Sequence, residues 1–187
     1  MAQTSTQRYG YPTASRWLHW LTALVVLATI PVGVIMTTEG LPRTVQNTLF
    51  IFHKNVGVII LLLVAARLLI RSATRTEPLP AETAAWQKTA ASVSHAALYV
   101  LLLVMTISGY VRVAAGGFPI ESLDALGIPK LVPRSDPLAD TAQWIHSSAR
   151  FILAAFIFLH IGAALQHGLI KRDGVFTRMW PLNAPRP

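Results

Sequence analysis

Four long apolar segments, separated by polar connections, account for most of the chain. They cover approximately residues 15–38, 48–70, 89–111 and 142–170. Each is close to the ~20 residues that an α-helix needs to cross ~30 Å of hydrocarbon. A helix satisfies its own backbone hydrogen bonds in lipid, so helices are the natural form for such segments. The pattern predicts an all-α membrane protein, a four-transmembrane-helix bundle that forms a single domain over residues 1–187.

Composition agrees with this interpretation. Of the 187 residues, 53% are hydrophobic and only 13% are charged. An ordinary soluble domain carries more charge and less apolar surface. The chain has no cysteine, which excludes disulfides, iron–sulfur clusters and thiolate-ligated haem within it.

The basic residues indicate how the bundle is oriented. The net charge of +8 does not favour nucleic acid, because these residues lie at the ends of the apolar segments. Ten of them share one side of the predicted membrane: Arg8, Arg16, Arg67, Arg71, Arg75, Lys88, Lys171, Arg172, Arg178 and Arg186. Six lie on the other side, diluted by acidic residues: Arg43, Lys54, Arg112, Lys130, Arg134 and Arg150. The positive-inside rule therefore predicts cytoplasmic termini and a place in a bacterial inner membrane.

The connecting segments differ in length. No small-residue cleavage pattern follows the first span, so we expect it to remain as an anchor. The first connection, residues 39–47, is short and contains Gly40 and Pro42 as helix breakers. Residues 72–87 suggest a turn followed by an interfacial helix carrying Trp86. Residues 116–140 form the longest connection, on the outside, and loops of this length are usually functional or disordered.

The histidines are the main candidates for chemistry, since an ionisable side chain in a membrane span is costly and usually functional. His19 lies near the cytoplasmic end of the first span, and His53 lies near the outer end of the second. The fourth span carries His146 near its outer end and His160 14 residues later. In a helix, 14 residues rise ~21 Å and turn about 3.9 times, so both rings project from one face. The depths of the four histidines in the membrane thus predict two pairs. His53 matches His146 near the outer end, and His19 matches His160 near the cytoplasmic end.

Paired imidazoles at two depths favour haem iron. Bis-histidine ligation fills both axial positions, which suits electron transfer better than oxygen binding. A lone histidine in a span is more often a partner in helix packing, and zinc or copper would call for more donors than neutral imidazoles supply here. Glycines on the spans either admit a porphyrin or let helices pack closely. These glycines are Gly33, Gly57, Gly109 and Gly162.

Several motifs carry a family resemblance. They are the run RWLHW that ends at Trp20, the run HKNVG that begins at His53, and the stretch from His146 through HIGAALQH and KRDG to Met179. Together they are similar to the bacterial cytochrome b561 family across nearly the whole chain. Ser147 stands where that family often has an acidic residue directly after the outer histidine.

The resemblance implies two haem b groups and a set of axial ligands. It implies that His53 and His146 ligate the outer haem, and that His19 and His160 ligate the inner one. It also points to di-haem proteins that act as superoxide:ubiquinone oxidoreductases. Superoxide and ubiquinone are then the expected reactants, and the expected class of the chain is oxidoreductase or electron-transfer protein.

Other polar residues in the spans are secondary candidates. His95 and His167 lie near the cytoplasmic ends of their spans, where either can replace an inner ligand, contact a propionate or line a quinone site. His167 is the stronger candidate for a proton donor to quinone. Four cations are candidate propionate contacts, although snorkelling towards the interface explains them equally well. They are Arg67 and Lys171 inside, and Lys54 and Arg150 outside.

Three functions are compatible with these features. The first is a stand-alone di-haem b cytochrome that moves electrons across the inner membrane between an outer-face donor, such as superoxide, and the quinone pool. The second is a cytochrome b anchor subunit of a larger dehydrogenase or hydrogenase, with a redox partner docked on it. The third is a haem-free membrane transporter, which would call for discontinuous helices and a polar site at mid-depth. The histidines lie towards both interfaces instead, which argues against the third function, and the first function is our preferred interpretation.

Overall fold

A computed structural model describes residues 11–74, 78–81 and 83–182 of the chain. Its elements in chain order are α1 (Thr13–Ile35), α2 (Arg43–Ala73), α3 (Ala85–Ala115), α4 (Glu121–Ala125), α5 (Asp136–Leu165), the π-helix η1 (Gln166–Lys171) and the 3₁₀-helix η2 (Phe176–Met179). Four of the helices, with α5 and η1 counted as one, are long and apolar enough to cross a membrane. The prediction of an all-α four-helix membrane bundle is confirmed.

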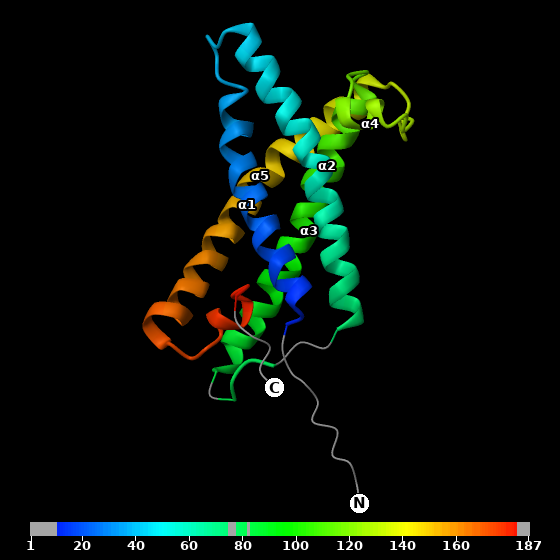
Figure 1. Ribbon diagram of the computed structural model, residues 1–187. Coiled ribbons are helices and arrows are strands. Elements are labelled where there is room, and N and C mark those ends of the chain that lie inside the picture. The colour runs from blue at the N-terminus through cyan, green and yellow to red at the C-terminus, as the bar shows by residue number, and fades with distance from the viewer. Residues whose placement is uncertain (1–10, 75–77, 82, 183–187) are drawn as a thin grey trace, which may run out of the picture.

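The long helices form one bundle. α1 packs against α2, α2 packs against α3, and α3 makes its most extensive contacts with α5. α5 runs obliquely across the other helices (Figure 1). The connection from α1 to α2 and the helix α4 lie at one end, whereas η1 and η2 lie at the other (Figure 1). We call these the outer and the inner end, in keeping with the predicted topology.

The helices extend beyond the apolar segments that predicted them. α5 begins at Asp136, where the Ser135 hydroxyl accepts a hydrogen bond from the Leu138 backbone and Pro137 stands in the first turn. A serine cap followed by proline is a strong helix start, and it adds a polar turn outside the lipid. The expected interfacial helix before the third span is absent from the described residues of that connection, because Trp86 belongs to the first turn of α3.

A small apolar core separates the two ends of the bundle. Val26, Ile60 and Val64 are buried against one another, with Leu102 and Ile157 packed around them. These side chains come from all four long helices. The core therefore holds the helices together at mid-depth and leaves the two ends for polar groups.

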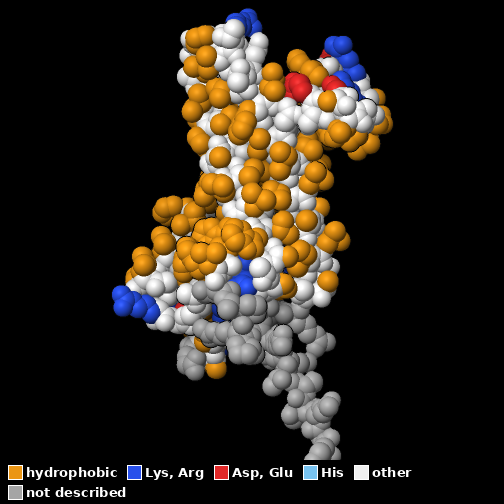
Figure 2. All heavy atoms as spheres, in the orientation of Figure 1, with side chains coloured by type: hydrophobic (Ala, Val, Ile, Leu, Met, Phe, Trp, Pro, Cys, Tyr) orange, Lys and Arg blue, Asp and Glu red, His pale blue; other side chains and the backbone are white. Residues whose placement is uncertain are grey.

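The surface fits a lipid environment. Hydrophobic side chains cover the middle of the visible face, and Lys and Arg side chains gather towards its ends (Figure 2). Many large apolar side chains are exposed to the surroundings, among them Leu62, Leu69 and Phe158. Contiguous apolar surface of this kind is stable in a bilayer and unfavourable in water.

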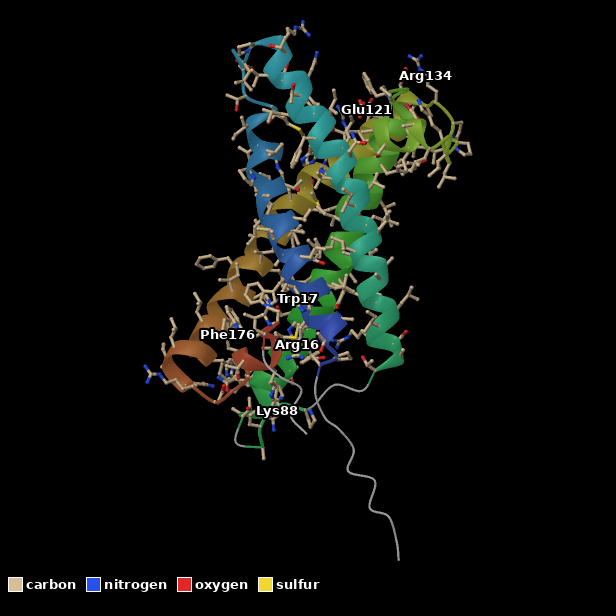
Figure 3. All side chains as sticks on the ribbon, viewed as in Figure 1. Arg16, Trp17, Lys88, Glu121, Arg134 and Phe176 are labelled. Atoms are coloured by element: carbon tan, nitrogen blue, oxygen red, sulfur yellow. The ribbon has the colours of Figure 1, made fainter. Side chains whose placement is uncertain are left out.

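Specific contacts tie down the connections at each end. At the outer end, Lys54 Nζ of α2 lies 2.8 Å from a carboxylate oxygen of Glu121 in α4. At the inner end, the Trp20 indole donates to the Met179 carbonyl at 2.7 Å, so the segment after α5 returns to α1. Arg16 and Phe176 lie together at this end in Figure 3, and Glu121 lies at the opposite end.

Candidate functional site

The structure brings the predicted outer histidines together. His53 of α2 and His146 of α5 have ring centres 6.2 Å apart, with their planes 80° from parallel. The Nδ1 atom of His146 lies 2.9 Å from the Met105 carbonyl oxygen. Because a carbonyl only accepts, this nitrogen carries the proton, and Nε2 keeps the free lone pair. The Ser108 hydroxyl lies 3.3 Å from the same Nδ1.

The predicted inner histidines are also neighbours, and a third histidine joins them. His19 of α1 and His160 of α5 have ring centres 6.1 Å apart at 65°. His95 of α3 lies closer still, with its ring centre 5.4 Å from that of His160. The inner cluster around His160 therefore has three imidazoles, whereas the outer cluster has two.

A guanidinium group stands beside the inner cluster. Arg67 Nη2 lies 3.1 Å from His19 Nδ1, and the same guanidinium lies 5.2 Å from the centre of the Tyr99 ring. Arg71 lies over the same ring at 5.9 Å. Both distances suit a cation–π contact. Two positive charges thus lie close to the inner histidines.

The spacing of the rings fits iron. A metal–imidazole bond is about 2 Å long, so two rings on one iron have centres roughly 6 Å apart. The separations of 6.2 Å and 6.1 Å match this value, and the 5.4 Å of the His95 contact does not. Among the described residues, no group of three or more His, Cys, Asp or Glu side chains is arranged to hold a bare metal ion. Two imidazoles at a time suit haem, which supplies four further nitrogens itself.

The inner histidine pair also fits haem iron, provided that one hydrogen bond, from Arg67 to His19, is given up. A guanidinium only donates, so the His19 Nδ1 atom accepts the hydrogen bond from Arg67. If His19 held haem iron through Nε2, its ring proton would lie on Nδ1 and Arg67 would lose this acceptor. A carboxylate near the pair, such as a haem propionate, is the natural next partner for that guanidinium.

The outer cations have other roles in the structure. Lys54 donates to the Pro119 carbonyl at 2.8 Å as well as to Glu121, which attaches α4 beside His53. Asn55 strengthens this attachment, since its amide nitrogen lies 2.7 Å from the other Glu121 oxygen. Arg150 lies over the Phe151 ring at 4.6 Å on the exposed surface. A propionate contact of Lys54 or Arg150 stays a prediction.

The contact between Lys54 of α2 and Glu121 of α4 favours the ionised form of Glu121. Desolvation alone would raise the pKa of Glu121, but hydrogen bonds from Lys54, the backbone and Asn55 lower it below its ordinary value. The Lys54 charge is therefore compensated at neutral pH. The cations that act on His146 are Arg112 and Arg150 instead.

Ser147 also has a defined place. Its hydroxyl accepts from the Gln143 amide at 2.6 Å, and the Gln143 carbonyl oxygen accepts from Arg112. A chain of hydrogen bonds thus links α3 to α5 next to His146. Ser147 thus contributes a neutral hydroxyl to this chain at the position where the family often has an acidic residue.

His167 pairs with an acid at the inner end. It lies in the π-helix η1, and its Nδ1 atom is 2.6 Å from the Asp173 carboxylate. Desolvation alone would raise the pKa of Asp173, but hydrogen bonds from His167 and the Val175 backbone lower it. Lys171 donates to the Gln87 side chain at 2.9 Å, which ties η1 to α3. Lys171 thus lies on an exposed connection, and a propionate contact for it stays a prediction.

Sequence reasoning missed several partners of these residues. Asp173 and Glu121 are ordinary loop acids in the sequence, and only the fold brings them to His167 and Lys54. The closeness of His95 to His160 depends on how α3 is rotated against α5. Only the His167–Asp173 pair left a signal in the sequence, because the two residues are six positions apart and can meet within one short segment.

Comparison with known proteins agrees with this geometry. Residues 10–182 match the family model described as prokaryotic cytochrome b561. The chain is 29% identical to cytochrome b561 homolog 2 of Escherichia coli strain K12, over 96% of this chain and 95% of the relative. It is 30% identical to cytochrome b561 homolog 1 of the same strain, over 88% of this chain and 93% of the relative. The chain belongs to the prokaryotic cytochrome b561 family and is a membrane b-type cytochrome of electron transfer.

Proposed function

We propose that the chain holds two b-type haems and carries electrons from a donor at the outer face to quinone at the inner face. The two histidine pairs at opposite ends of the bundle carry this proposal. His53 and His146 are the outer axial ligands, and His19 and His160 are the inner ones. A haem in each pair supplies a centre that takes up and releases one electron.

α5 sets the distance between the two sites. It contributes one ligand to each pair, and these ligands are separated by about four helical turns. The apolar core of Val26, Ile60 and Val64 lies between the two levels and keeps water out of the path. A rise of ~21 Å between the ligand positions leaves a shorter gap between the edges of two large macrocycles.

The charges favour flow from the outer site to the inner one. Arg67 acts electrostatically on both His19 and His160. A fixed positive charge stabilises an added electron, so it raises the reduction potential of the inner site. Outside, Arg112 and Arg150 act on His146 in the same sense as Arg67 does inside, and the Met105 carbonyl, which points its negative end at that ring, opposes them. Arg67 lies in direct contact with His19, so we expect its influence to be the larger and an electron to move from the outer pair to the inner one.

Superoxide is the proposed donor because a small anion needs only a positive approach to the outer site. Arg112 and Arg150 supply this next to His146. Two superoxide anions each lose one electron and become dioxygen, and one quinone takes up both electrons with two protons to become a quinol. The His167–Asp173 pair stands at the inner end, where those protons enter from the cytoplasm.

Rapid mixing of the purified holoprotein with enzymatically generated superoxide tests this function. Haem absorbance should report fast reduction, and added ubiquinone should restore the oxidised spectrum. The Arg150→Gln variant should be reduced several-fold more slowly at low salt, and the difference should shrink as salt screens the charge. Arg43→Gln, at the outer start of α2, is the matched control and should behave as the wild type.

Three results would contradict the proposal. Slow reduction that does not respond to salt would remove superoxide as the donor. If a co-purifying dehydrogenase reduced the haems rapidly under the same conditions, the chain would be an anchor subunit of a larger complex. A protein that binds no haem would contradict both assignments.

A further inference from the structure

Two glycines stand directly behind the outer histidine rings. A Cβ atom at Gly33 of α1 would lie 2.9 Å from Cε1 and 3.4 Å from Nδ1 of His53. A Cβ atom at Gly109 of α3 would lie 3.2 Å from Cε1 and 3.3 Å from Nδ1 of His146. Each imidazole therefore touches helix backbone that any larger residue would cover.

This arrangement is confined to the outer site. Among the glycines of the described part of the chain, only Gly33 and Gly109 meet a histidine ring. A Cβ atom added at Gly57 or Gly162 would meet no neighbouring group within 4 Å, so these two glycines face open space. At the inner site, the neighbours of the rings are His95 and Arg67 instead.

We infer that Gly33 and Gly109 are positioning residues that fix the planes of the two outer axial imidazoles. The inference rests on the proposed haem ligation by His53 and His146. The sequence suggested that these glycines admit the porphyrin or help helices pack, and the contacts assign them to the ligands instead.

The side-chain torsions of the two histidines explain this role. An imidazole ring turns easily about its second side-chain torsion, because that torsion has a broad energy profile. For His146, the Met105 carbonyl holds Nδ1, and the Gly109 backbone lies against the Cε1–Nδ1 edge of the ring. For His53, the backbone of α1 at Gly33 limits rotation of the ring. A Cβ atom at Gly33 would lie 2.9 Å from Cε1, which is the shortest distance in this set. The two backbone segments come from different helices, and they leave the planes 80° apart.

The ring planes matter for electron transfer. The orientation of an axial imidazole decides how its π-orbitals overlap with those of iron, and second-shell contacts that orient a ligand tune the metal. Nearly perpendicular axial rings give a ferric low-spin spectrum of high anisotropy, distinct from that of parallel rings. The outer haem thus carries a spectroscopic signature of the position of these two backbone segments.

Gly33→Ala is the direct test. Alanine favours a helix over glycine, and the clash involves the movable end of a side chain, so the bundle should fold normally. His53 must then turn or withdraw. Electron paramagnetic resonance of the holoprotein should show a shifted signal for the outer haem, or roughly tenfold weaker retention of it, with the inner signal unchanged. Gly109→Ala should give a smaller shift, because its contact is longer.

Controls separate this inference from the proposed function. Gly162→Ala, on an exposed face of α5, should leave both signals as in the wild type. In a His53→Ala background, Gly33→Ala should add no further change, since its effect acts through that ring. A wild-type protein without haem would contradict the proposed function itself. Two haems in the wild type with an unchanged outer signal in Gly33→Ala, or the same shift in Gly162→Ala, would overturn only the positioning role.

Discussion

The outer and inner histidine sites share a spacing but differ in their surroundings. Outside, the rings meet backbone: a carbonyl at Met105 and the glycines Gly33 and Gly109. Inside, the rings meet side chains, among them the guanidinium of Arg67 and the imidazole of His95. The outer rings are thus in contact with rigid neutral groups, although Arg112 and Arg150 act on His146 electrostatically, and the inner rings are in contact with mobile and charged ones.

This difference indicates how one bundle would obtain the two unlike electron centres that we propose. Backbone contacts fix geometry without adding charge, so they suit a site whose ligands must not move when an anionic donor approaches. Charged side chains shift a potential and also exchange partners, as we expect of Arg67 between His19 and a carboxylate. Charged side chains therefore suit a site that transfers electrons and protons to a second reactant.

The largest predicted effect comes from removing one ligand on α5. His146→Ala should remove the outer haem and leave the inner one, while His160→Ala should do the reverse. Each change deletes a proposed axial ligand at one site and leaves the other site intact. A pyridine haemochrome assay against protein concentration measures the loss, and spectra of the remaining haem identify the site.

His95 provides a second test of the ligand assignment. It gives the inner site a third histidine close to His160, and the outer site has no such neighbour among the described residues. We expect His95→Ala to keep both haems, since its distance from His160 is too short for a shared iron. If His95→Ala lost the inner haem while His160→Ala kept it, the inner pair would have to be reassigned. The outer pair would be unaffected by that result.

The next largest effect concerns protons at the inner end. His167→Asn should slow quinone-driven oxidation of the reduced protein by roughly 100-fold, because a positioned acid group contributes about that much or more to proton transfer. Asp173→Asn should slow it less, since the imidazole remains but loses the group that fixes its tautomer. Stopped-flow absorbance follows both reactions.

The spectra provide the check on this prediction. Both haem signals should be unchanged in these variants, because neither residue is a proposed axial ligand. Gln166→Ala is the matched control, since Gln166 is exposed in the same π-helix, and it should react at the wild-type rate. Equal slowing in all three variants would indicate that η1 is merely unfolded.

A smaller effect is expected at Arg67. At ~8 Å and an effective dielectric constant of ~20, one unit charge contributes about 2 kcal/mol. For a one-electron couple this equals roughly 90 mV, since about 59 mV corresponds to a tenfold change. Arg67→Gln should therefore lower the potential of the inner haem by several tens of millivolts and leave the outer haem unchanged. A redox titration that resolves the two haems measures this, and a shift confined to the outer haem would reverse the assigned direction of flow.

The smallest effect concerns the attachment of α4. Because the folded-state pKa of Glu121 is lowered, its ionised form stabilises the fold above its ordinary pKa of 4.5, and this stabilisation disappears as the pH falls through the lower value. Glu121→Gln should cost less than about 1 kcal/mol at pH 7, as expected for a partly exposed ion pair. Thermal unfolding of the two proteins should differ at pH 7 and converge in acid. A gap that persisted in acid would mean that the carboxylate charge is not the cause.

The sequence predicted the four helices and the depth of the histidines because both depend on local quantities. Hydropathy identifies a span, and helix rise alone relates His146 to His160. The partners of these rings depend on helix rotation, which no local pattern specifies. His95 illustrates this, since the sequence places it at the right depth but does not show that it faces α5.

Loop contacts were harder to predict for the same reason. Lys54 was predicted to contact a propionate, which stays a prediction, and the structure shows that it also attaches α4 through Glu121, 67 residues away. The fold of the connection, with Gly117 at φ +80°, brings that acid back to α2. A non-local ion pair leaves no periodic signal in the sequence.

The haem content of the purified wild-type protein tests the central claim most directly. One b-type haem at each histidine pair is the proposed composition of the holoprotein. A pyridine haemochrome assay, combined with an accurate protein concentration, should give close to two haems per chain, and a redox titration should resolve two components. A ratio near one would contradict the assignment of two levels, and the absence of haem would contradict the proposed electron path altogether.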